Sequence, residues 1–369
     1  FYLWKVKKNM KLKLYQSYIL KSFLYYFSLV SVIFLVLTFF LNILEEITFF
    51  EKFNLNISYP LFLTFLNTPS LLYEIFPFIF LISSQIFIFN FYEKDELNLL
   101  KITGIDNFSL IKIIALASLL MGVLISTVFY TFSADLKHNY LSIKNKFSND
   151  NKYLAAINNN GLWIKDQYEE YIYIINADEY KNEQLKNITI NKLNKDFDII
   201  NFIFAEQANI ETYNWELNNV NIFYKDGKKE ALDKLIFNSN FNKNKLDSIF
   251  SNLTSLNILQ LIELSKDYKK LGYSNIEIKT HLYKLYLLPI YVTIMAIIGS
   301  ILMLYLNYFN SKLFNISIGI MASVIIYYIN HFFSLLGITE KTSVLLSVSV
   351  PLIILTMFCF IGIVKINEK

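Results

Sequence analysis

Several residue types are scarce in this chain, and each shortage excludes a class of protein. There is one cysteine, Cys359, so no intrachain disulfide can form, and its apolar surroundings are typical of an inert packing thiol. Nine glycines and five prolines are too few for a collagen-like or low-complexity disordered chain. All 34 basic residues are lysines, so anions would meet point charges rather than forked guanidinium groups. The weak net charge of +4 indicates nothing about nucleic acid.

Motifs for catalysis and metal binding are also absent. The Gly227-Lys228 pair lacks the earlier glycine that a phosphate-binding loop requires. The three histidines, His138, His281 and His331, are scattered, and no H-E-x-x-H or cysteine cluster accompanies them. No serine occurs in a G-x-S-x-G motif. We therefore predict a chain without catalytic or metal-binding residues that binds no cofactor of its own.

Apolar residues are abundant. They make up 54% of the 369 residues and give a mean hydropathy of +0.39, which excludes an ordinary soluble enzyme. Six runs are long enough to cross hydrocarbon, which takes roughly 20 residues of helix. The predicted spans are Ser22–Leu44, Leu71–Phe91, Ser109–Phe132, Leu282–Leu306, Phe314–Gly337 and Val344–Val364. The first is too long for a secretory signal and lacks a cleavage site. We expect Met10 to be the natural start and Phe1–Asn9 to be upstream sequence.

Lysines predict the orientation of the spans. They are frequent before the first span, in the loop with Lys94 and Lys101, at Lys312 and in the tail, whereas the opposite short loops hold only Lys52 and Lys341. This asymmetry predicts cytoplasmic termini and a periplasmic polar block. The expected domains are a membrane half at 1–132 with a cytoplasmic loop at about 92–108, a periplasmic insert at 133–280 and a second membrane half at 281–369.

The polar insert alternates apolar and polar residues with a period of two, as in Tyr171-Ile172-Tyr173-Ile174 and in 186–190 and 219–224. Turn signals such as Asp226-Gly227 separate these segments. The pattern predicts an all-β sandwich or jelly roll that starts near Tyr153 and has Trp163 in its core. After it, Thr254–Leu271 has helical spacing, with Gly272 as the stop, and we interpret it as an amphipathic connector near the outer membrane face.

Three features together resemble the LptF/LptG family, the membrane-spanning subunits of the ATP-driven lipopolysaccharide exporter. The first is the layout of three helices, a large β insert and three more helices. The second is the loop Glu93-Lys94-Asp95-Glu96-Leu97-Asn98-Leu99-Leu100-Lys101-Ile102-Thr103-Gly104, which resembles the family's coupling segment. The third is Gly161-Leu162-Trp163-Ile164-Lys165-Asp166 followed by 171–174, which is most similar to the LptG type. Pro69, Pro77 and the run Tyr283-Lys284-Leu285-Tyr286-Leu287-Leu288-Pro289 are similar in type and spacing.

The resemblance implies a non-catalytic permease subunit in the bacterial inner membrane. Its implied partners are an LptB-like cytosolic ATPase dimer, which would hold the ATP and magnesium, an LptF-like second permease, an LptC- or LptA-like periplasmic bridge protein, and lipopolysaccharide. The lipid would leave a membrane cavity and enter the periplasmic β domain. The rival interpretation is a secondary transporter or lipid-scaffolding membrane protein without an ATPase, although the two halves show no inverted repeat. A macrolide-exporter type of permease would have four spans.

Residue roles follow from the same resemblance. A force-transmitting loop helix would dock Leu97 and Leu100 in a groove of the ATPase, with Asp95 and Glu96 beside them and Gly104 as the helix stop. The alternative is that these charges are a solvated loop flank. Polar residues of two spans are candidates for the substrate cavity or lateral gate, with helix-end solvation or helix packing as the alternative: Asn42, Glu45, Tyr327 and Asn330. The first of these stands where the family has a basic residue.

Overall fold

The structure is a computed structural model that describes residues 14–53, 56–145, 147, 162–168, 170–181, 184–243, 245–246, 252–270, 273–306 and 312–367. The chain forms two compact units, one through Ser133 and from Lys279 onward, the other Ala134–Ile278. We call them the membrane unit and the β domain. The expected domain start near Tyr153, the helix stop at Gly272 and the segment Phe1–Asn9 lie outside the described residues.

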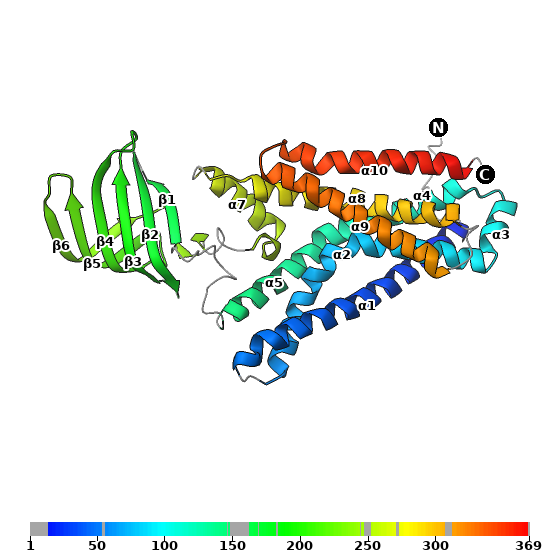
Figure 1. Ribbon diagram of the computed structural model, residues 1–369, viewed down its shortest axis with the longest axis horizontal. Coiled ribbons are helices and arrows are strands. Elements are labelled where there is room, and N and C mark those ends of the chain that lie inside the picture. The colour runs from blue at the N-terminus through cyan, green and yellow to red at the C-terminus, as the bar shows by residue number, and fades with distance from the viewer. Residues whose placement is uncertain are drawn as a thin grey trace, which may run out of the picture. The chain divides into compact units, whose positions relative to one another are not determined.

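Six helices in the described part of the chain are long and apolar enough to cross a membrane, which confirms the predicted number of spans. The helices are α1 (Leu14–Phe50), α2 (Ser58–Glu93), α3 (Glu96–Ile102), α4 (Asn107–Leu124), α5 (Tyr130–Asn145), α7 (Ile258–Lys270), α8 (Ile276–Leu306), α9 (Lys312–Ile338) and α10 (Val344–Asn367), as Figure 1 shows. Short turns are η1 (Glu51–Phe53), η2 (Ile125–Phe129) and η3 (Leu253–Ser255). The third span joins α4 and α5 through η2, which is π-helical.

Helix α2 is the centre of the membrane unit. It packs against both α1 and α9, and its span is the most buried of the six. Pro69 and Pro77 lie inside it, a position tolerated where neighbouring helices and hydroxyl side chains satisfy the freed backbone groups. Phe80 is fully buried here and packs against Phe27 of α1, with ring centroids 4.7 Å apart. Many apolar residues of α1, α4, α9 and α10 are exposed within this chain, as expected for helices surrounded by lipid.

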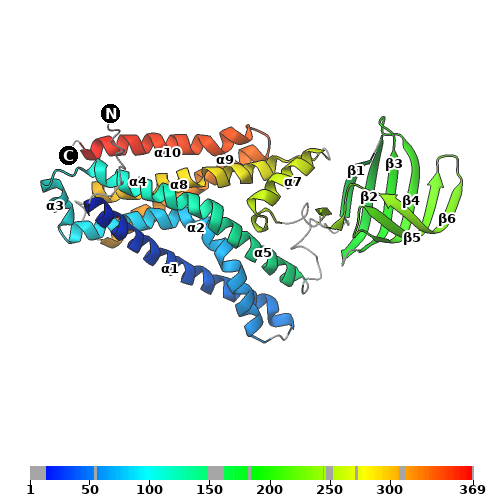
Figure 2. The same cartoon turned by 180° about the vertical axis from the view of Figure 1, so that it is seen from behind.

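The inserted domain contains the predicted β fold, together with helix α7. Its strands are β1 (Leu162–Tyr168), β2 (Tyr171–Lys181), β3 (Gln184–Leu193), β4 (Ile199–Asn209), β5 (Asn214–Tyr224) and β6 (Lys229–Asn238). Every strand pairs antiparallel with the next, so the described strands form one sheet in meander order, which Figures 1 and 2 show from two sides. This order differs from the crossed connections of a jelly roll.

The sheet bends across its middle so that both ends of the long strands face one core. In β3 the buried residues are Leu185 on one side of the bend and Ile188 on the other, so the alternation shifts by one residue between them. The same shift occurs in β4 and β5. Asn187 and Asn219, at the bend, have positive φ angles of 49° and 54°. Strands that bend in this way fold a sheet onto itself and produce a sandwich-like interior.

Trp215 anchors that interior and is fully buried. Its indole Nε1 donates a hydrogen bond to the Phe241 carbonyl at 2.7 Å, and its ring lies against Phe237, which also contacts Tyr173 from the other side of the bend. Trp163, by contrast, is 58% exposed. The prediction that Trp163 fills the core was wrong, because Leu162 and Ile164 face the core and Trp163 lies on the opposite face.

A segment after β6 returns to β1 and closes the fold. Asp166 of β1 is fully buried and accepts hydrogen bonds from Ser239 Oγ at 2.7 Å, Asn240 N–H at 3.0 Å and Asn240 Nδ2 at 2.9 Å. These donors satisfy the carboxylate, which makes its burial tolerable. Asp166 therefore ties the first strand to the end of the last one.

Helix α7 begins one turn later than the sequence pattern indicated. Asn257 Oδ1 accepts a hydrogen bond from Gln260 N–H at 3.0 Å, and Gln260 Oε1 accepts one from Asn257 N–H at 2.9 Å. This reciprocal capping box sets the start of the helix at Ile258. The N-x-x-Q spacing in the sequence was a signal for this start.

Candidate functional site

The short helix α3 lies between α2 and α4, and its two ends are set by local geometry. Asp95 precedes it with a left-handed φ of 57° and accepts a hydrogen bond from Asn98 Nδ2 at 3.0 Å. At the other end Gly104 has a φ of 82°. The Gly104 and Ile105 N–H groups donate to the Lys101 and Leu100 carbonyls at 3.0 and 2.9 Å, the pattern of a helix that ends at a left-handed glycine.

The two faces of α3 differ. Leu97 is buried in the membrane unit's core, and Leu100 packs against that core. Leu99 and Ile102 point the other way and are 60% and 81% exposed. The expectation that Leu97 and Leu100 form a free docking edge is therefore wrong, because these two side chains hold α3 onto its own chain. The outward apolar pair is Leu99 and Ile102.

Glu96 is anchored within the chain. Its Oε1 accepts a hydrogen bond from the Tyr18 hydroxyl of α1 at 2.9 Å. Glu93, one turn earlier at the end of α2, is exposed. The carboxylate of Glu96 thus links α3 to the start of the first span, a contact that spacing along the loop could not have revealed.

The loop after α3 is fixed as well. Asp106 caps α4, and its Oδ1 accepts a hydrogen bond from Ser109 N–H at 3.1 Å. Hydrogen bonds from Ser109 hold the pKa of the Asp106 carboxyl below its usual value. Asn107 Nδ2 donates to the Ile366 carbonyl at 3.3 Å, near the end of α10. Together with the contact to Tyr18, these bonds place α3 at the end of the membrane unit where α1 begins and α10 ends (Figure 2).

The candidate cavity residues of the first span have different environments. Asn42 is buried between α1 and α2, where its Oδ1 accepts from Asn67 Nδ2 at 3.0 Å and its Nδ2 donates to the Thr64 carbonyl at 3.4 Å. Glu45 is exposed, whereas the adjacent Glu46 is fully buried. Asn42 therefore contributes to the packing of α1 against α2. Glu45 is the exposed carboxylate of the pair on α1.

The candidates on α9 lie elsewhere. Tyr327 is partly exposed, contacts the Phe78 ring of α2 at 6.0 Å and stacks on His331 at 6.2 Å. Asn330 is partly buried one turn away. Eleven residues of α2 separate Asn67 from Phe78, or roughly 16 Å of helix. The structure therefore does not bring the α1 and α9 candidates into one site within this chain.

A buried polar contact that the sequence analysis missed joins α2 to α8 and α9. Gln85 is fully buried and donates from Nε2 to the Asn315 carbonyl at 3.2 Å. Gly319 of α9 faces the end of the Gln85 side chain, and Gly299 of α8 faces Ser84 and the Leu81 carbonyl, where a Cβ would meet backbone. The signal was present as Ser83-Ser84-Gln85 within an apolar run.

A second missed contact joins the third and fourth spans. Directly after the π-helical η2, the Tyr130 hydroxyl lies 2.9 Å from His281 Nε2 of α8. Before η2, Gly122 packs against Pro289 and Val292 of α8 without space for a side chain. The third span is thus π-helical between these two contacts, and α8 has Pro289 inside it. π-helical turns are often found at functional sites.

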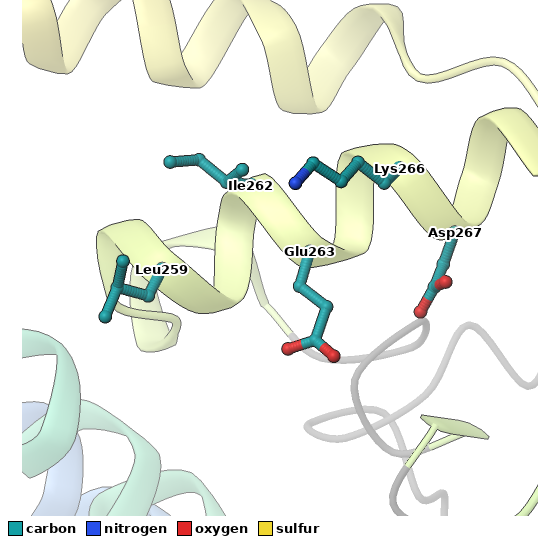
Figure 3. Close-up of a pocket in the computed structure, with 5 residues that line it drawn as sticks. All are labelled: Leu259, Ile262, Glu263, Lys266 and Asp267. Atoms are coloured by element: carbon teal, nitrogen blue, oxygen red, sulfur yellow. The ribbon is translucent and has the colours of Figure 1, made fainter.

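The β domain has a pocket along α7, of about 400 Å³. Its lining residues all come from that helix and are labelled in Figure 3: Leu259, Ile262, Glu263, Lys266 and Asp267. The two carboxylates point to one side of α7, and Ile262 and Lys266 to another. Asp267 forms an ion pair with Lys245 at 3.7 Å, and none of these residues was a predicted site.

The fold defines a class, a polytopic membrane protein with a β domain inserted between its third and fourth spans. The family model described as lipopolysaccharide export system permease LptF/LptG matches residues 17–365. The chain therefore belongs to the LptF/LptG family of lipopolysaccharide export permeases, and the resemblance is confirmed. The model covers LptF and LptG together and does not separate them. No curated protein matches the sequence.

Proposed function

We propose that this chain is the LptG-like permease subunit of an ATP-driven transporter that extracts lipopolysaccharide from the inner membrane. It pairs with an LptF-like subunit, takes its energy from an LptB-like ATPase dimer and passes the lipid to an LptC- or LptA-like periplasmic bridge. The observation that carries this proposal, beyond family membership, is helix α3. It is anchored on one face by Leu97 and presents the apolar pair Leu99 and Ile102 on the other.

An anchored helix with an outward apolar face is suited to transmit force. Burying Leu99 and Ile102 in a partner's groove would remove apolar surface from water, each side chain contributing about 1.5–3 kcal/mol when fully buried. The contacts of Leu97 and Glu96 would carry the partner's movement into the core of the membrane unit and into α1.

Co-purification tests this proposal. A tagged chain expressed with its genomic neighbours should bring down an ATPase. The double substitution Leu99→Ser and Ile102→Ser should abolish this co-purification. Leu259→Ser is the matched control, because Leu259 is equally exposed but lies on α7 in the β domain. If the wild-type chain never brings down an ATPase, the transporter assignment fails. If both variants retain the ATPase, α3 is not the docking helix.

Glu96 could act in one of two ways, and substitutions distinguish them. If Glu96 acts by holding α3 to α1, Tyr18→Phe and Glu96→Ala should both reduce ATPase capture several-fold, while Glu96→Gln, which can still accept the hydrogen bond, should not. If Glu96 instead meets a basic group of the ATPase, Glu96→Gln should fail and Tyr18→Phe should succeed. Glu93→Ala is the control for general loop charge. If Glu93→Ala and Glu96→Ala lower ATPase capture equally, both residues contribute only to the general charge of the loop.

Orientation is part of the proposal. The lysine asymmetry supports cytoplasmic termini, a cytoplasmic α3 and a periplasmic β domain. A reporter active only in the cytoplasm should be active when fused after Leu100, Lys312 or Lys369 and inactive near Asp226. An active reporter near Asp226 would show that the proposed orientation is wrong.

The gate is proposed on the open faces of α1 and α9, which are the two least buried spans within the chain. Tyr327 and Glu45 lie on such faces, with Asn330 one turn from Tyr327. A photo-crosslinking side chain at Tyr327 should capture lipopolysaccharide in intact cells, and one at Asn42, which is buried against α2, should not. If crosslinkers at Tyr327 and at Glu45 both fail to capture lipopolysaccharide, these residues do not line the lipid path.

A further inference from the structure

Strand β4 is apolar on both of its faces. Its segment Ile199–Ala205 is a run of apolar side chains interrupted by one asparagine. Ile203 and Ala205 are buried in the core of the β domain. Phe202 and Phe204 alternate with them, lie on the opposite, outer face and are exposed. Since strands that are covered on both faces read as near-continuous apolar runs, the outer face of β4 is suited to be covered by another molecule.

The exposed side chains of β4 belong to two rows that cross the outer face of the sheet. Strand pairing aligns one row as Lys165, Ile174, Asn191, Phe202, Phe223 and Lys229. It aligns the next row toward the bend as Trp163, Asn176, Thr189, Phe204, Asn221 and Ala231. We call Phe202, Phe204 and Phe223, which are all exposed on β4 and β5, the aromatic patch. Exposed apolar patches rimmed by polar residues mark interaction sites.

Lysines border the aromatic patch on both sides. Lys165 on β1 and Lys229 on β6 end the first row, five strand spacings or roughly 24 Å apart along the sheet. Lys229 Nζ lies 5.4 Å from the ring centroid of Phe223, and Lys165 Nζ lies 5.9 Å from that of Phe197. Among the described residues, no carboxylate lies within ion-pair distance of either ammonium group. Both positive charges can therefore attract carboxylates of another molecule.

A membrane and a second copy of this chain both fit the outer face poorly. Asparagine and threonine side chains lie in the same two rows as the aromatic ones, and hydrocarbon would leave such polar groups without hydrogen bonds. In a face-to-face pair of copies aligned along the first row, lysine would meet lysine at both ends, and like charges across an interface are unfavourable. The sheet of another protein can pack flat at about 10 Å and supply both hydrogen bonds and carboxylates.

We propose that the aromatic patch docks the sheet face of a β domain in another protein, with carboxylates of that partner opposite Lys165 and Lys229. The aromatic rings form the desolvated centre of this interface and the two lysines its polar rim, the arrangement typical of protein–protein contacts. The partner therefore has an apolar sheet face with acidic residues on both sides. This contact goes beyond the proposed export function, because it uses neither α3 nor the gate residues.

Photo-crosslinking in intact cells tests the docking face. The full-length chain, expressed with its genomic neighbours, carries p-benzoylphenylalanine in place of Phe202. The control carries it in place of Tyr213, which is exposed and precedes β5. We expect a protein adduct at Phe202 and none at Tyr213. Mass spectrometry of the crosslinked peptide should place the adduct on a β strand of the partner, with aspartate or glutamate on the neighbouring surface.

Charge reversal then tests the pairing with the crosslinker still at position 202. Lys165→Glu combined with Lys229→Glu should lower the adduct about tenfold, because attraction across the interface becomes repulsion. Replacing the partner's neighbouring carboxylates with lysine should restore it, which also shows that the doubly reversed chain still folds. The matched control is Lys186→Glu combined with Lys234→Glu, two exposed lysines of β3 and β6 across the bend. This control makes the same change in net charge and should leave the adduct in place.

Support for the proposal requires both an adduct on such a sheet face and its dependence on the two lysines. An adduct with lipid alone, or no adduct at Phe202, would overturn the docking of a protein. An adduct with a second copy of this chain would overturn the assigned partner. An adduct that both charge-reversed chains retain equally would overturn the pairing of Lys165 and Lys229 with carboxylates.

Discussion

In the membrane unit, apolar side chains cover the outside of the helices and also pack between them, with small or polar side chains at some of the closest contacts. Gln85, Ser84, Gly299 and Gly319 meet in this way around α2. In the β domain the exposed surface carries charged residues instead, and Trp215 lies at the centre of an apolar interior. The comparison shows that burial has a different meaning in each unit. Water drives apolar groups inward in the β domain, whereas in lipid close approach and hydrogen bonding hold the helices together.

The largest effect should come from the two tryptophans of the β domain. Trp215→Ala should destabilise the domain by about 3–5 kcal/mol, the range for deleting a buried aromatic side chain. Trp163→Ala, on the exposed face, should cost less than about 1 kcal/mol. Hydrogen exchange of the β4 and β5 amides in the full chain measures the difference. Equal destabilisation by both substitutions would mean that Trp163 also carries core packing.

The next effect should come from Asp166. Removing its carboxylate leaves the Ser239 and Asn240 donors without their acceptor, which should cost about 2–4 kcal/mol. Asp166→Ala should therefore open the end of the β domain to limited proteolysis after β6. Asp178→Ala is the control, because Asp178 also accepts a hydrogen bond, from Asn187 at 3.0 Å, but is exposed. Protease resistance of Asp166→Ala would show that the closure does not depend on this carboxylate.

The membrane unit should respond to added volume. Gly319→Leu places a side chain against Gln85 and should lower stability in detergent by about 1–3 kcal/mol, as overpacking does. Met321→Leu, at an exposed position of the same helix, should have little effect. The double variant Gly319→Leu with Gln85→Ala should recover part of the loss, measured by thermal unfolding. If the double variant recovers no stability, the loss caused by Gly319→Leu does not arise from the Gln85 contact.

The smallest effect should come from Tyr273, whose hydroxyl accepts a hydrogen bond from Lys165 N–H at 2.7 Å at the edge of β1. Tyr273→Phe should cost about 1 kcal/mol and speed exchange of the Lys165 amide. Burial raises the pKa of this hydroxyl. Its stabilisation should therefore be complete below the unfolded value of about 10 and be lost as pH rises through the folded-state pKa. Tyr213→Phe, at an exposed position, should show neither effect.

The number of spans and the position of the inserted domain were predictable because both depend on local composition. A run of apolar residues as long as the hydrocarbon is thick indicates a span whatever surrounds it. The end of α3 at Gly104 was predictable for a similar reason, since a left-handed glycine terminates a helix through its own neighbours.

The faces of the elements were harder to predict. On β1, Trp163 shares a face with Lys165, and the buried Asp166 shares one with Ile164, so polarity along the strand was misleading. On α3, four leucine and isoleucine residues surround the helix, and the pattern did not show which two would be covered. In both cases the answer depends on neighbours that are distant in the chain.

The sequence by itself determined the class of protein, because the apolar runs and the polar insert between them are properties of contiguous residues. Only the tertiary structure decided that the sheet bends at Asn187 and Asn219, that Leu99 and Ile102 are the outward pair of α3, and that Trp163 lies outside the core. The physical reason is that faces are set by contacts with residues distant in the chain. The core of the membrane unit covers one side of α3, and the bend of the sheet shifts the alternation along a strand by one residue. In β3, for example, Leu185 and Ile188 face one core although they are three positions apart.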